Sequence, residues 1–313
     1  MIDKDRLAKV TDVFFHASCP DGTAAAMIVA DTYAAMEWEV KLHSVQYGTD
    51  FHANLRAEPG QLFVDITPPI GRWREWLEHT PIVLDHHETA REVTEGLGGV
   101  YATNERSSGA VLAYEQVAVP LFGGNDEWRK FAETAMIRDT WKKDHALWKE
   151  ACAQAYALQL FGSRRLIEQV QEGSFQHRQL EEVGRLLLDS SDRSSKKAAG
   201  GSVRQTVSVG GQDYSVATFN CTEKIISDAA NLLLEEGADV AAGYFFLFED
   251  GVQRAVVSLR TKGRVSARAM AESQGGGGHD RAAGFKIEPA DRVSPSVVAE
   301  IVRAALAAAG RSA

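Results

Sequence analysis

Cysteine is scarce in this sequence, and long apolar stretches are missing. Cys19, Cys152 and Cys221 are the only cysteines among 313 residues. Their odd number and wide spacing argue against a disulfide framework and favour reduced thiols. No uninterrupted apolar run approaches the length of a membrane span, and the polar residues 1–6 are unlike a secretory signal. We therefore expect a cytoplasmic protein that is not bound to a membrane.

Positive charge is also in short supply. The sequence has 34 Lys and Arg residues against 43 Asp and Glu residues, which gives a formal net charge of -9. Sequence-independent binding of long duplex DNA depends on neutralising many phosphates with Lys and Arg, so such binding is not expected. Short or small substrates fit this charge better. The length of 313 residues exceeds what one hydrophobic core usually serves, so two domains are expected.

The order of the apolar patterns predicts two α/β domains. In the first half, strand-like runs alternate with helix-like segments, which is typical of a parallel sheet with helices on both faces. Further along, strand-like runs flank 210–213 and 249–252, and together with helical segments they predict a smaller α/β domain with a mixed sheet. The polar, small-residue tract 189–202 is the predicted linker. The predicted domains are therefore 1–188 and 203–313.

Three of the strand-like runs in the first half end in polar side chains. Residues 12–15 precede His16 and Asp21, residues 61–64 precede Asp65, and residues 81–84 precede Asp85, His86 and His87. Open α/β sheets keep their sites at the carboxyl ends of their strands. Carboxylates and neutral imidazoles suit divalent ions such as manganese, and water bound to such ions becomes a nucleophile near neutral pH.

The ordered landmarks of the chain resemble the DHH family of phosphoesterases. They are His16-Ala17-Ser18-Cys19-Pro20-Asp21-Gly22, Asp65, Asp85-His86-His87, Arg106-Ser107-Ser108-Gly109, Asp139-Thr140-Trp141 and Gly275-Gly276-Gly277-Gly278-His279. The last of them, followed by 282–285, is similar to the signature of the DHH-associated substrate-binding domain. The resemblance implies that 1–188 is a metal-binding catalytic domain and that 203–313 binds the substrate. It also implies a hydrolase of phosphodiesters or phosphoanhydrides with one or two Mn²⁺ ions, for which Mg²⁺ or Co²⁺ are alternatives.

The resemblance further implies roles for individual residues. Asp65 is expected to bridge both ions, His86 is the expected imidazole ligand, and His87 is expected to orient the water or donate a hydrogen bond. The expected metal ligands are His16, Asp21, Asp65, Asp85, His86 and Asp139. The expected catalytic residues are Asp65, Asp85, His86 and His87.

The first motif departs from the family pattern, because it contains one carboxylate where the family has two. Depending on the alignment of Asp21, either Cys19 or Thr23 occupies the place of the missing carboxylate. We expect Cys19 to be a small packing residue under the sheet, since free cysteine is among the most buried residue types. The alternative is a thiolate ligand, which would shift the metal preference toward softer ions such as zinc.

The glycine-rich segment near the C-terminus is the predicted anion-binding loop. Without Cβ atoms, Gly276, Gly277 and Gly278 let the backbone aim its amide hydrogens at a phosphate, and His279 follows them. Arg260 can bind a phosphate in bidentate fashion. Arg106 and Ser108 are also predicted to lie near the substrate phosphate, because the helix that begins at Gly109 offers an anion site at its N-terminus.

The leading functional hypothesis is a phosphodiesterase that hydrolyses short oligonucleotides, or a small nucleotide phosphoester, with metal-activated water. Its plan resembles the small oligoribonucleases of the family, which makes it a nuclease that binds short nucleic acid. One alternative is a phosphoanhydride hydrolase that acts on polyphosphate or pyrophosphate. Another is a nucleotide-binding regulatory protein with a degenerate metal centre. The sequence leaves open which nucleotide is cleaved, whether RNA or DNA is preferred, and whether the chain forms a homodimer.

Overall fold

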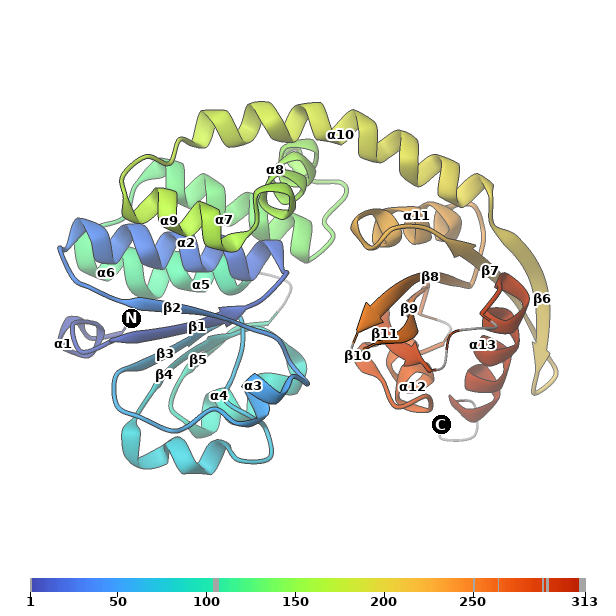
Figure 1. Cartoon of the computed structure of the whole chain (residues 1–313), viewed down its shortest axis with the longest axis horizontal. Helices are drawn as coiled ribbons and strands as arrows, with labels where there is room; N and C mark the ends of the chain where they lie inside the picture. Colours follow the sequence, from blue (N-terminus) through green and yellow to red (C-terminus); the bar gives the residue numbers. More distant parts are fainter. Residues whose placement is uncertain are drawn as a thin grey trace. The chain divides into compact units, whose positions relative to one another are not determined.

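The chain folds into two compact units, Met1–Leu188 and Asp189–Ala313. The computed structural model describes residues 2–103, 107–249, 251–263, 265–288, 290 and 293–309 (Figure 1). Each unit has its own sheet and its own apolar clusters, which confirms the predicted α/β fold class.

The sheet of the first unit is entirely parallel. Its strands are β1 (Asp12–His16), β2 (Lys41–Val45), β3 (Gln61–Val64), β4 (Ile82–Asp85) and β5 (Val100–Tyr101), and their order is β2-β1-β3-β4-β5. Every residue of β3 and β4 is buried, as expected of parallel strands that helices cover on both faces. Val64 pairs with Leu84, so β3 and β4 end beside each other.

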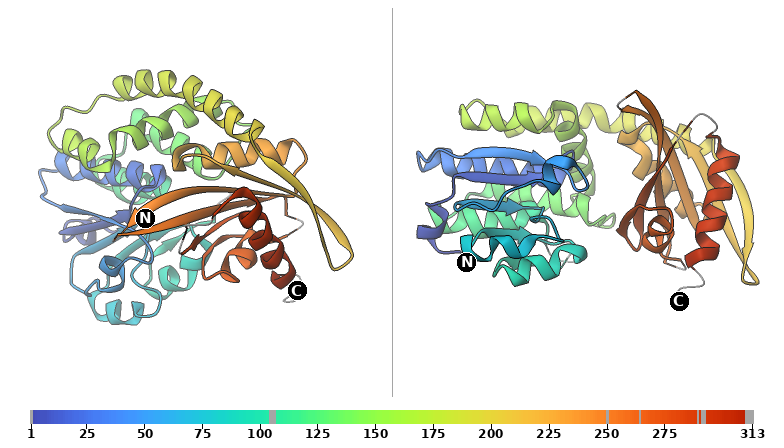
Figure 2. Two further views of the ribbon diagram at one scale, coloured as in Figure 1. Left: turned by 45° about the vertical axis from the view of Figure 1, so that its right-hand side comes forward. Right: turned by 60° about the horizontal axis from the view of Figure 1, so that its bottom comes forward.

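Helices cover both faces of this sheet, as Figures 1 and 2 show. One layer contains α2 (Pro20–Ala35), α5 (Gly109–Ala113), α7 (Asp126–Asp139), α8 (Trp148–Phe161) and α9 (Ser163–Gln171), which share the larger apolar core. The other face carries α3 (Asp50–Ala53), η1 (Trp73–His79) and α4 (Arg91–Gly96) over a smaller core. The short elements are α1 (Lys4–Leu7), η2 (Glu88–Ala90), η3 (Tyr114–Ala118) and α6 (Val119–Phe122).

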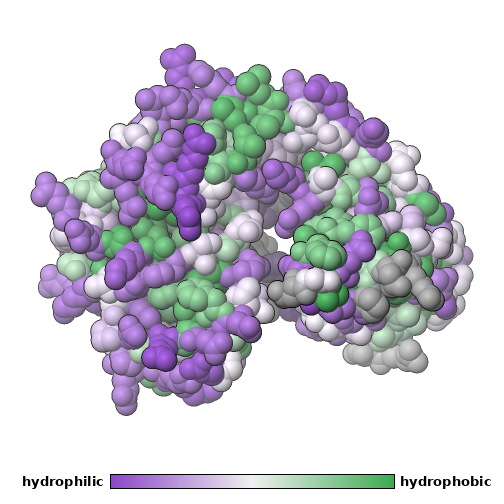
Figure 3. Space-filling view, in the orientation of Figure 1, coloured by the Kyte–Doolittle hydropathy of each residue, from purple (hydrophilic) through white to green (hydrophobic). Residues whose placement is uncertain are grey.

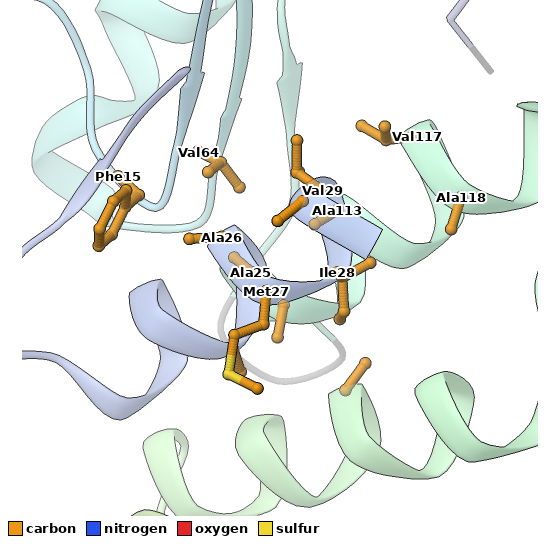
Figure 4. Packing of buried hydrophobic residues seen from close by; sticks show 14 of the residues in the cluster. Phe15, Ala25, Ala26, Met27, Ile28, Val29, Val64, Ala113, Val117 and Ala118 are labelled. Carbon is orange, nitrogen blue, oxygen red and sulfur yellow. The ribbon is translucent and has the colours of Figure 1, made fainter. Parts of the chain in front are cut away.

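Helix α2 is the centre of the first unit. Residues 24–30 of this helix are alanine, methionine, isoleucine or valine, and all of them are buried. A helix that is apolar all round must be enclosed by other elements, and α2 lies between β1 and the helices α5, α7 and α9. Figure 4 shows Ala25, Met27 and Ile28 of α2 among side chains of the sheet and of α5 and η3. The small alanines allow this close approach.

The region 164–200 differs from the sequence prediction. The helical periodicity of residues 164–188 predicts one helix, but the chain is interrupted at Gly173, which has a φ of 68°. There α9 ends, and α10 (His177–Gly200) begins after it. The predicted linker 189–202 is helical as far as Gly200. Ala, Lys and Arg are good helix formers, and a helix with a polar surface can be stable as a connection between compact units. Polar composition at 189–202 therefore does not produce an irregular chain.

The second unit is built on a mixed sheet. Its strands are β6 (Val203–Val209), β7 (Gln212–Asn220), β8 (Val240–Glu249), β9 (Val252–Thr261), β10 (Gly277–His279) and β11 (Ala282–Ile287), in the order β10-β11-β9-β8-β7-β6. β7 and β8 are parallel, because α11 (Glu223–Glu235) connects them, and the other neighbours are antiparallel. α11 covers one face of this sheet. α12 (Ala267–Glu272) and α13 (Pro295–Ala309) pack against the other.

The surface carries apolar side chains in separate patches. In Figure 3, hydrophilic residues surround several smaller apolar areas on the visible face. Leu186 and Phe248 are the most exposed of the large apolar residues that the structure describes. Isolated exposed side chains of this kind are common in folded proteins. Within the described part of the chain, no helix has both the length and the apolar character needed to cross a membrane.

His177 should make the stability of the first unit depend on pH. Its ring packs against the rings of Trp128, Phe131 and Phe175, at centroid distances of 4.6, 5.2 and 4.8 Å. Burial lowers the pKa of His177, so the folded chain resists protonation of this ring more than the unfolded chain does. Stability is therefore retained above the ordinary His pKa of about 6.5 and is lost as the pH falls below it.

The variant His177→Phe removes the titrating group but keeps an aromatic ring at this position. We expect its melting temperature to fall less between pH 8 and pH 5 than that of the parent. Thermal unfolding followed by circular dichroism measures this difference. His145→Phe, at an exposed position, is the control. Equal pH slopes for the parent and His177→Phe would contradict the prediction.

Candidate metal centre

The strand ends of the first unit bring the predicted site residues together. In the strand order β2-β1-β3-β4-β5, the chain continues from β1 toward one edge of the sheet and from β3 toward the other edge. The strand order therefore reverses between β1 and β3. Ligands of open α/β sheets bind at such a switch point, outside the carboxyl ends of the strands. His16 ends β1, Asp65 follows β3, and Asp85 ends β4.

Asp65 is at the centre of this cluster. The residue is fully buried, and its Oδ1 lies 2.9 Å from His86 Nε2 while its Oδ2 lies 3.5 Å from His16 Nδ1. Its backbone has a φ of 59°, in the left-handed region. A non-glycine residue in this region is strained, and such strain is concentrated at functional sites. The Asp65 amide donates to Leu84 O at 2.9 Å, which holds the strained residue against β4.

Two glycines make room for the Asp65 carboxylate. A Cβ atom on Gly109 would lie 2.4 Å from Asp65 Cβ and 3.0 Å from Asp21 Oδ2. A Cβ atom on Gly22 would lie 2.4 Å from the His16 carbonyl oxygen and 3.0 Å from Asp65 Oδ2. Both glycines occur in the motifs that the sequence analysis singled out, but their steric role is visible only in the folded chain.

Asp21 is held by the N-terminus of α5. Its carboxylate accepts hydrogen bonds from Ser108 Oγ at 2.7 Å, from the Gly109 amide at 2.6 Å and from the Ala110 amide at 3.1 Å. The partial positive charge at a helix N-terminus favours a carboxylate there. Burial, reinforced by the charges of Asp65 and Asp139, nevertheless raises the pKa of Asp21 well above its ordinary value.

His86 connects the carboxylates of the site. Its Nε2 lies 3.7 Å from Asp21 Oδ2 and 3.7 Å from Asp139 Oδ2, in addition to its contact with Asp65. Burial works against the ionised form of Asp65, but the contacts with His16 and His86 outweigh it and hold the pKa of Asp65 well below its usual range. Burial likewise works against protonation of His86, yet its hydrogen bond with Asp65 and the nearby carboxylates raise the pKa of His86.

Asp85 orients His87. Its Oδ1 accepts a hydrogen bond from the His87 backbone amide at 2.8 Å and lies 2.8 Å from His87 Nδ1. His87 Nδ1 is also 3.9 Å from Asp65 Oδ1. Burial alone would lower the pKa of His87. The hydrogen bond with Asp85 and the charge of Asp65 outweigh burial and raise this pKa to about 9.

Cys19 is not packed under the sheet, in contrast to the sequence prediction. It is the half-buried N-cap residue of α2, and its side chain makes no capping hydrogen bond. Burial and the charges of Asp65, Asp139 and Asp21 raise the pKa of its thiol well above the ordinary value. Thr23, the other position where the family has a carboxylate, is buried in the first turn of α2, and its amide donates to the Cys19 carbonyl at 2.9 Å.

The donor set fits divalent metal ions. Three groups have their potential ligand atoms within 4.8 Å of one another: His16, Cys19 and Asp65; Asp65, His86 and His87; and Asp21, His86 and Asp139. The groups share Asp65 and His86, so they form one continuous cluster. Within this cluster, His16 Nδ1, Asp65 Oδ2 and Asp85 Oδ2 are buried and make no hydrogen bond. Buried polar atoms rarely lack a partner, and a cation held by His16 and Asp65 would satisfy the first two. Asp85, a predicted ligand, is in none of the three groups.

Tyr47 is a residue of this site that the sequence analysis missed. Its ring lies 5.7 Å from the ring of His16 and 6.4 Å from that of His87, measured between centroids. Its hydroxyl accepts a hydrogen bond from the Thr67 amide at 3.1 Å. Burial and the charge of Asp85 raise the pKa of Tyr47, so it is a neutral wall of the site. In the sequence, Tyr47 could have been found only from its position just after the end of β2.

Ser108 and Arg106 are the two substrate residues predicted in the first unit. Ser108 is buried, and its hydroxyl donates to Asp21 while also accepting from the Val111 amide at 3.4 Å. It therefore supports a carboxylate of the cluster, and its predicted contact with the substrate stays a prediction. Arg106 lies outside the described residues.

The predicted glycine loop of the second unit is largely a strand. Gly277, Gly278 and His279 form β10, which pairs with β11 at the edge of the sheet. A Cβ atom on Gly276 would lie 2.1 Å from the Gly284 carbonyl oxygen, and one on Gly278 would lie 2.6 Å from Ala283 Cα. These two glycines are required for close packing of the backbone. At Gly277 a Cβ atom would meet no atom within 4 Å.

Arg260 is in β9, beside the strand pair β10 and β11. Its Nη1 donates to Ser258 Oγ at 3.0 Å and to the Leu259 carbonyl at 2.8 Å, and its Nη2 donates to Ser227 Oγ at 2.7 Å. Arg260 is directly opposite Ala282 of β11. The guanidinium is thus held in a fixed orientation by two hydroxyls and a carbonyl.

The fold and the cluster define a two-unit α/β protein with a His/Asp metal-site candidate at the ends of a parallel sheet. Residues 211–309 match the DHHA1 domain. The chain has the DHH/DHHA1 phosphoesterase architecture, with Asp85-His86-His87 in the first unit and the DHHA1 match in the second. This match and the shared fold agree with the resemblance seen in the sequence.

Several solved structures share this fold. Exonuclease RecJ bound to manganese has 15% sequence identity and a TM-score of 0.61, over 100% of this chain and 97% of that chain. RecJ from Thermus thermophilus in complex with Mn²⁺ has 16% identity and a TM-score of 0.55, over 96% of this chain and 53% of that chain. An exopolyphosphatase-related protein from Bacteroides fragilis has 10% identity and a TM-score of 0.51, over 98% of this chain and 96% of that chain. No curated protein matches the sequence.

Gly109→Ala should damage the site without unfolding the chain. The added methyl would meet Asp65 Cβ and Asp21 Oδ2, which must then move apart. A displacement of about 1 Å at a catalytic group costs on the order of 10²-fold in rate, and we expect a loss of this size in phosphoesterase activity. Gly71→Ala is the control, because a Cβ atom there meets nothing within 4 Å. Equal activity of the two variants, with equal melting temperatures, would show that Gly109 does not shape the site.

Proposed function

We propose that this protein hydrolyses phosphodiester bonds in short oligonucleotides or small nucleotides, with Mn²⁺ ions held by the strand-end cluster. The observation that carries the proposal is the convergence of His16, Asp21, Asp65, His86 and Asp139 at the strand ends, where His16 Nδ1 and Asp65 Oδ2 are buried and make no hydrogen bond. The RecJ structures that share this fold contain manganese. When bound, such ions lower the pKa of a water molecule and polarise the phosphate.

Asp65 is the proposed bridging carboxylate. Its Oδ2 faces His16 and its Oδ1 faces His86, so its two oxygens point to different donor groups. Only a carboxylate at this position would supply negative charge to two neighbouring cations. Asp21 and Asp139 complete the group around His86, and the proposed ligand set also includes Asp85.

His87 is the proposed contact to the scissile phosphate. Asp85 engages both its backbone amide and its Nδ1, which fixes the orientation of the ring beside the cluster. A ring held in this way can donate a hydrogen bond to a phosphate oxygen without first losing conformational freedom. The Tyr47 ring lies edge-on to the rings of His16 and His87.

The DHHA1 unit is the proposed holder of the rest of the substrate. Arg260, Gly277 and His279 are the candidates, because Arg260 is held by serine hydroxyls and Gly277 is exposed on an edge strand. The preference for short substrates is supported by the net charge of -9, which does not favour a long polyanion.

Hydrolysis should depend on Asp65 and on a divalent ion. The purified protein would be incubated with Mn²⁺ and with dinucleotides, short oligomers, 3′,5′-bisphosphates, pyrophosphate or polyphosphate, and the products separated by chromatography. We expect cleavage of the phosphodiesters, and loss of cleavage in a chelator. Asp65→Asn should reduce the rate by on the order of 100-fold or more, since even changes next to metal ligands have effects of about 10- to 100-fold.

Asp192→Asn, at an exposed position on α10, is the matched control for Asp65→Asn. Activity of Asp65→Asn within a few-fold of the control, at equal metal content, would contradict the proposed centre. Cleavage of polyphosphate or pyrophosphate without cleavage of any nucleotide would replace the phosphodiesterase proposal with a phosphoanhydride hydrolase.

Arg260 should affect substrate binding but leave the metal content unchanged. Loss of one partner from a hydrogen-bonded charge pair costs about 2 to 5 kcal/mol, so Arg260→Ala should raise KM strongly and lower kcat less. Steady-state kinetics and metal analysis by mass spectrometry measure the two effects. Arg254→Ala on the same strand, where the side chain pairs with Glu249 and Glu288, is the control. Loss of metal from Arg260→Ala would place this residue in the metal centre.

A further inference from the structure

The metal cluster contains a thiol at its edge. Cys19 Sγ, a ring nitrogen of His16 and an oxygen of Asp65 all lie within 4.8 Å of one another. Ligand atoms around a single ion are separated by distances of this order, because metal–ligand bonds are about 2.0 to 2.3 Å long for nitrogen, oxygen and sulfur donors. Cys19 thus has the position of a ligand. It belongs to the first motif, which contains one carboxylate where the family has two.

The neighbours of this thiol point independently to a cation. Asp65 is completely buried, and its Oδ2 has no hydrogen-bond partner in the structure. His16 Nδ1 is also buried and makes no hydrogen bond; it lies 3.5 Å from Asp65 Oδ2. Unsatisfied buried atoms of this kind are costly and uncommon. Asp65 Oδ2 and His16 Nδ1 lie beside the sulfur atom of Cys19. Each of these three atoms can donate an electron pair to a metal ion.

The backbone around Cys19 is shaped to place it there. The Ala17 amide donates to Val45 O at 2.6 Å, which extends the end of β1. Ser18 then has a φ of 56°, in the left-handed region, and Pro20 starts α2. The strained Ser18 turns the chain between the strand and the helix, so that Cys19 stays beside His16 and is not used as a capping group. Strain at a strand-to-helix turn is typical of functional sites.

The remaining donor groups are chemically different. Asp65, His86 and His87, and likewise Asp21, His86 and Asp139, offer only oxygen and nitrogen. Such donors suit manganese and magnesium, whereas a thiolate selects softer ions such as zinc. Thr23, the alternative position for the missing carboxylate, carries no charged oxygen. The group with Cys19 therefore differs from the other two groups in its donor atoms.

We propose that Cys19 is a thiolate ligand of one of two unequal metal positions, and that the position formed by His16, Cys19 and Asp65 prefers zinc or cobalt to manganese. The position around Asp21, His86 and Asp139 keeps the preference for harder ions. This inference rests on the proposed function, because it assigns the ions of the proposed hydrolytic centre. Its consequence is a mixed-metal centre, in which manganese added alone fills the sulfur-containing position poorly.

Cobalt absorption tests the proposal without any turnover. The full-length, metal-free protein would be titrated with Co²⁺ under reducing conditions, and the near-ultraviolet sulfur-to-cobalt charge-transfer band recorded together with the number of bound ions. We expect the band in the parent, in Cys152→Ser and in Cys221→Ser, and no band in Cys19→Ser. These two control variants remove the other cysteines of the chain.

Cys19→Asp provides a second variant if Cys19→Ser does not fold. It replaces sulfur with a carboxylate, so both ions should still bind, without the band. Its affinity for cobalt relative to manganese should fall on the order of 10-fold or more compared with the parent, which is the size of effect known for changes around metal ligands. Competition between the two ions, measured by mass spectrometry, gives this ratio.

Three results would overturn the assignment of Cys19. They are cobalt binding without a charge-transfer band, a band that persists in Cys19→Ser, and an unchanged cobalt-to-manganese ratio in Cys19→Asp. If the parent still cleaves phosphodiesters with manganese in any of these cases, the proposed function stands and only the sulfur ligand is rejected. A parent that binds no cobalt and cleaves nothing with manganese would overturn both.

Discussion

Negative charge buried at the end of a parallel sheet is the constraint on which the first unit depends. Asp21, Asp65 and Asp85 are nearly or completely inaccessible to water, and an uncompensated buried charge is expensive. The chain compensates Asp65 with the imidazoles of His16 and His86, and it compensates Asp21 with the hydroxyl and amides at the start of α5. The orphaned oxygens of Asp65 and Asp85 show that this internal compensation is incomplete.

This constraint explains why the helix layer is packed so closely. Asp21 is at the start of α2 and Gly109 is at the start of α5, so the two helices must approach each other for the carboxylate to reach the α5 amides. The run of alanines in α2 permits that approach, and Gly22 and Gly109 leave space for Asp65. Densely packed protein interiors transmit small shifts, so changes in the α2 core are coupled to the candidate metal site.

The second unit has a glycine-rich strand at the edge of its sheet. Gly276 and Gly278 allow β10 to lie close against β11, and Arg260 is held on the neighbouring strand by Ser227 and Ser258. A glycine-rich segment that is rigid in this way can present backbone amides in one conformation. The glycines therefore serve the packing of the sheet as well as any ligand, and composition alone does not separate the two roles.

The sequence by itself determined the α/β class and the strand ends that carry Asp65 and Asp85. These follow from apolar periodicity, which is a local property of the chain. Tertiary structure decided the rest: residues 189–200 are helical, Ser108 holds Asp21, and Tyr47 forms a wall of the site. It also brought Cys19 to His16 and Asp65 instead of under the sheet. Such contacts join segments far apart in sequence, so they depend on the strand order and on helix packing, which local patterns do not encode.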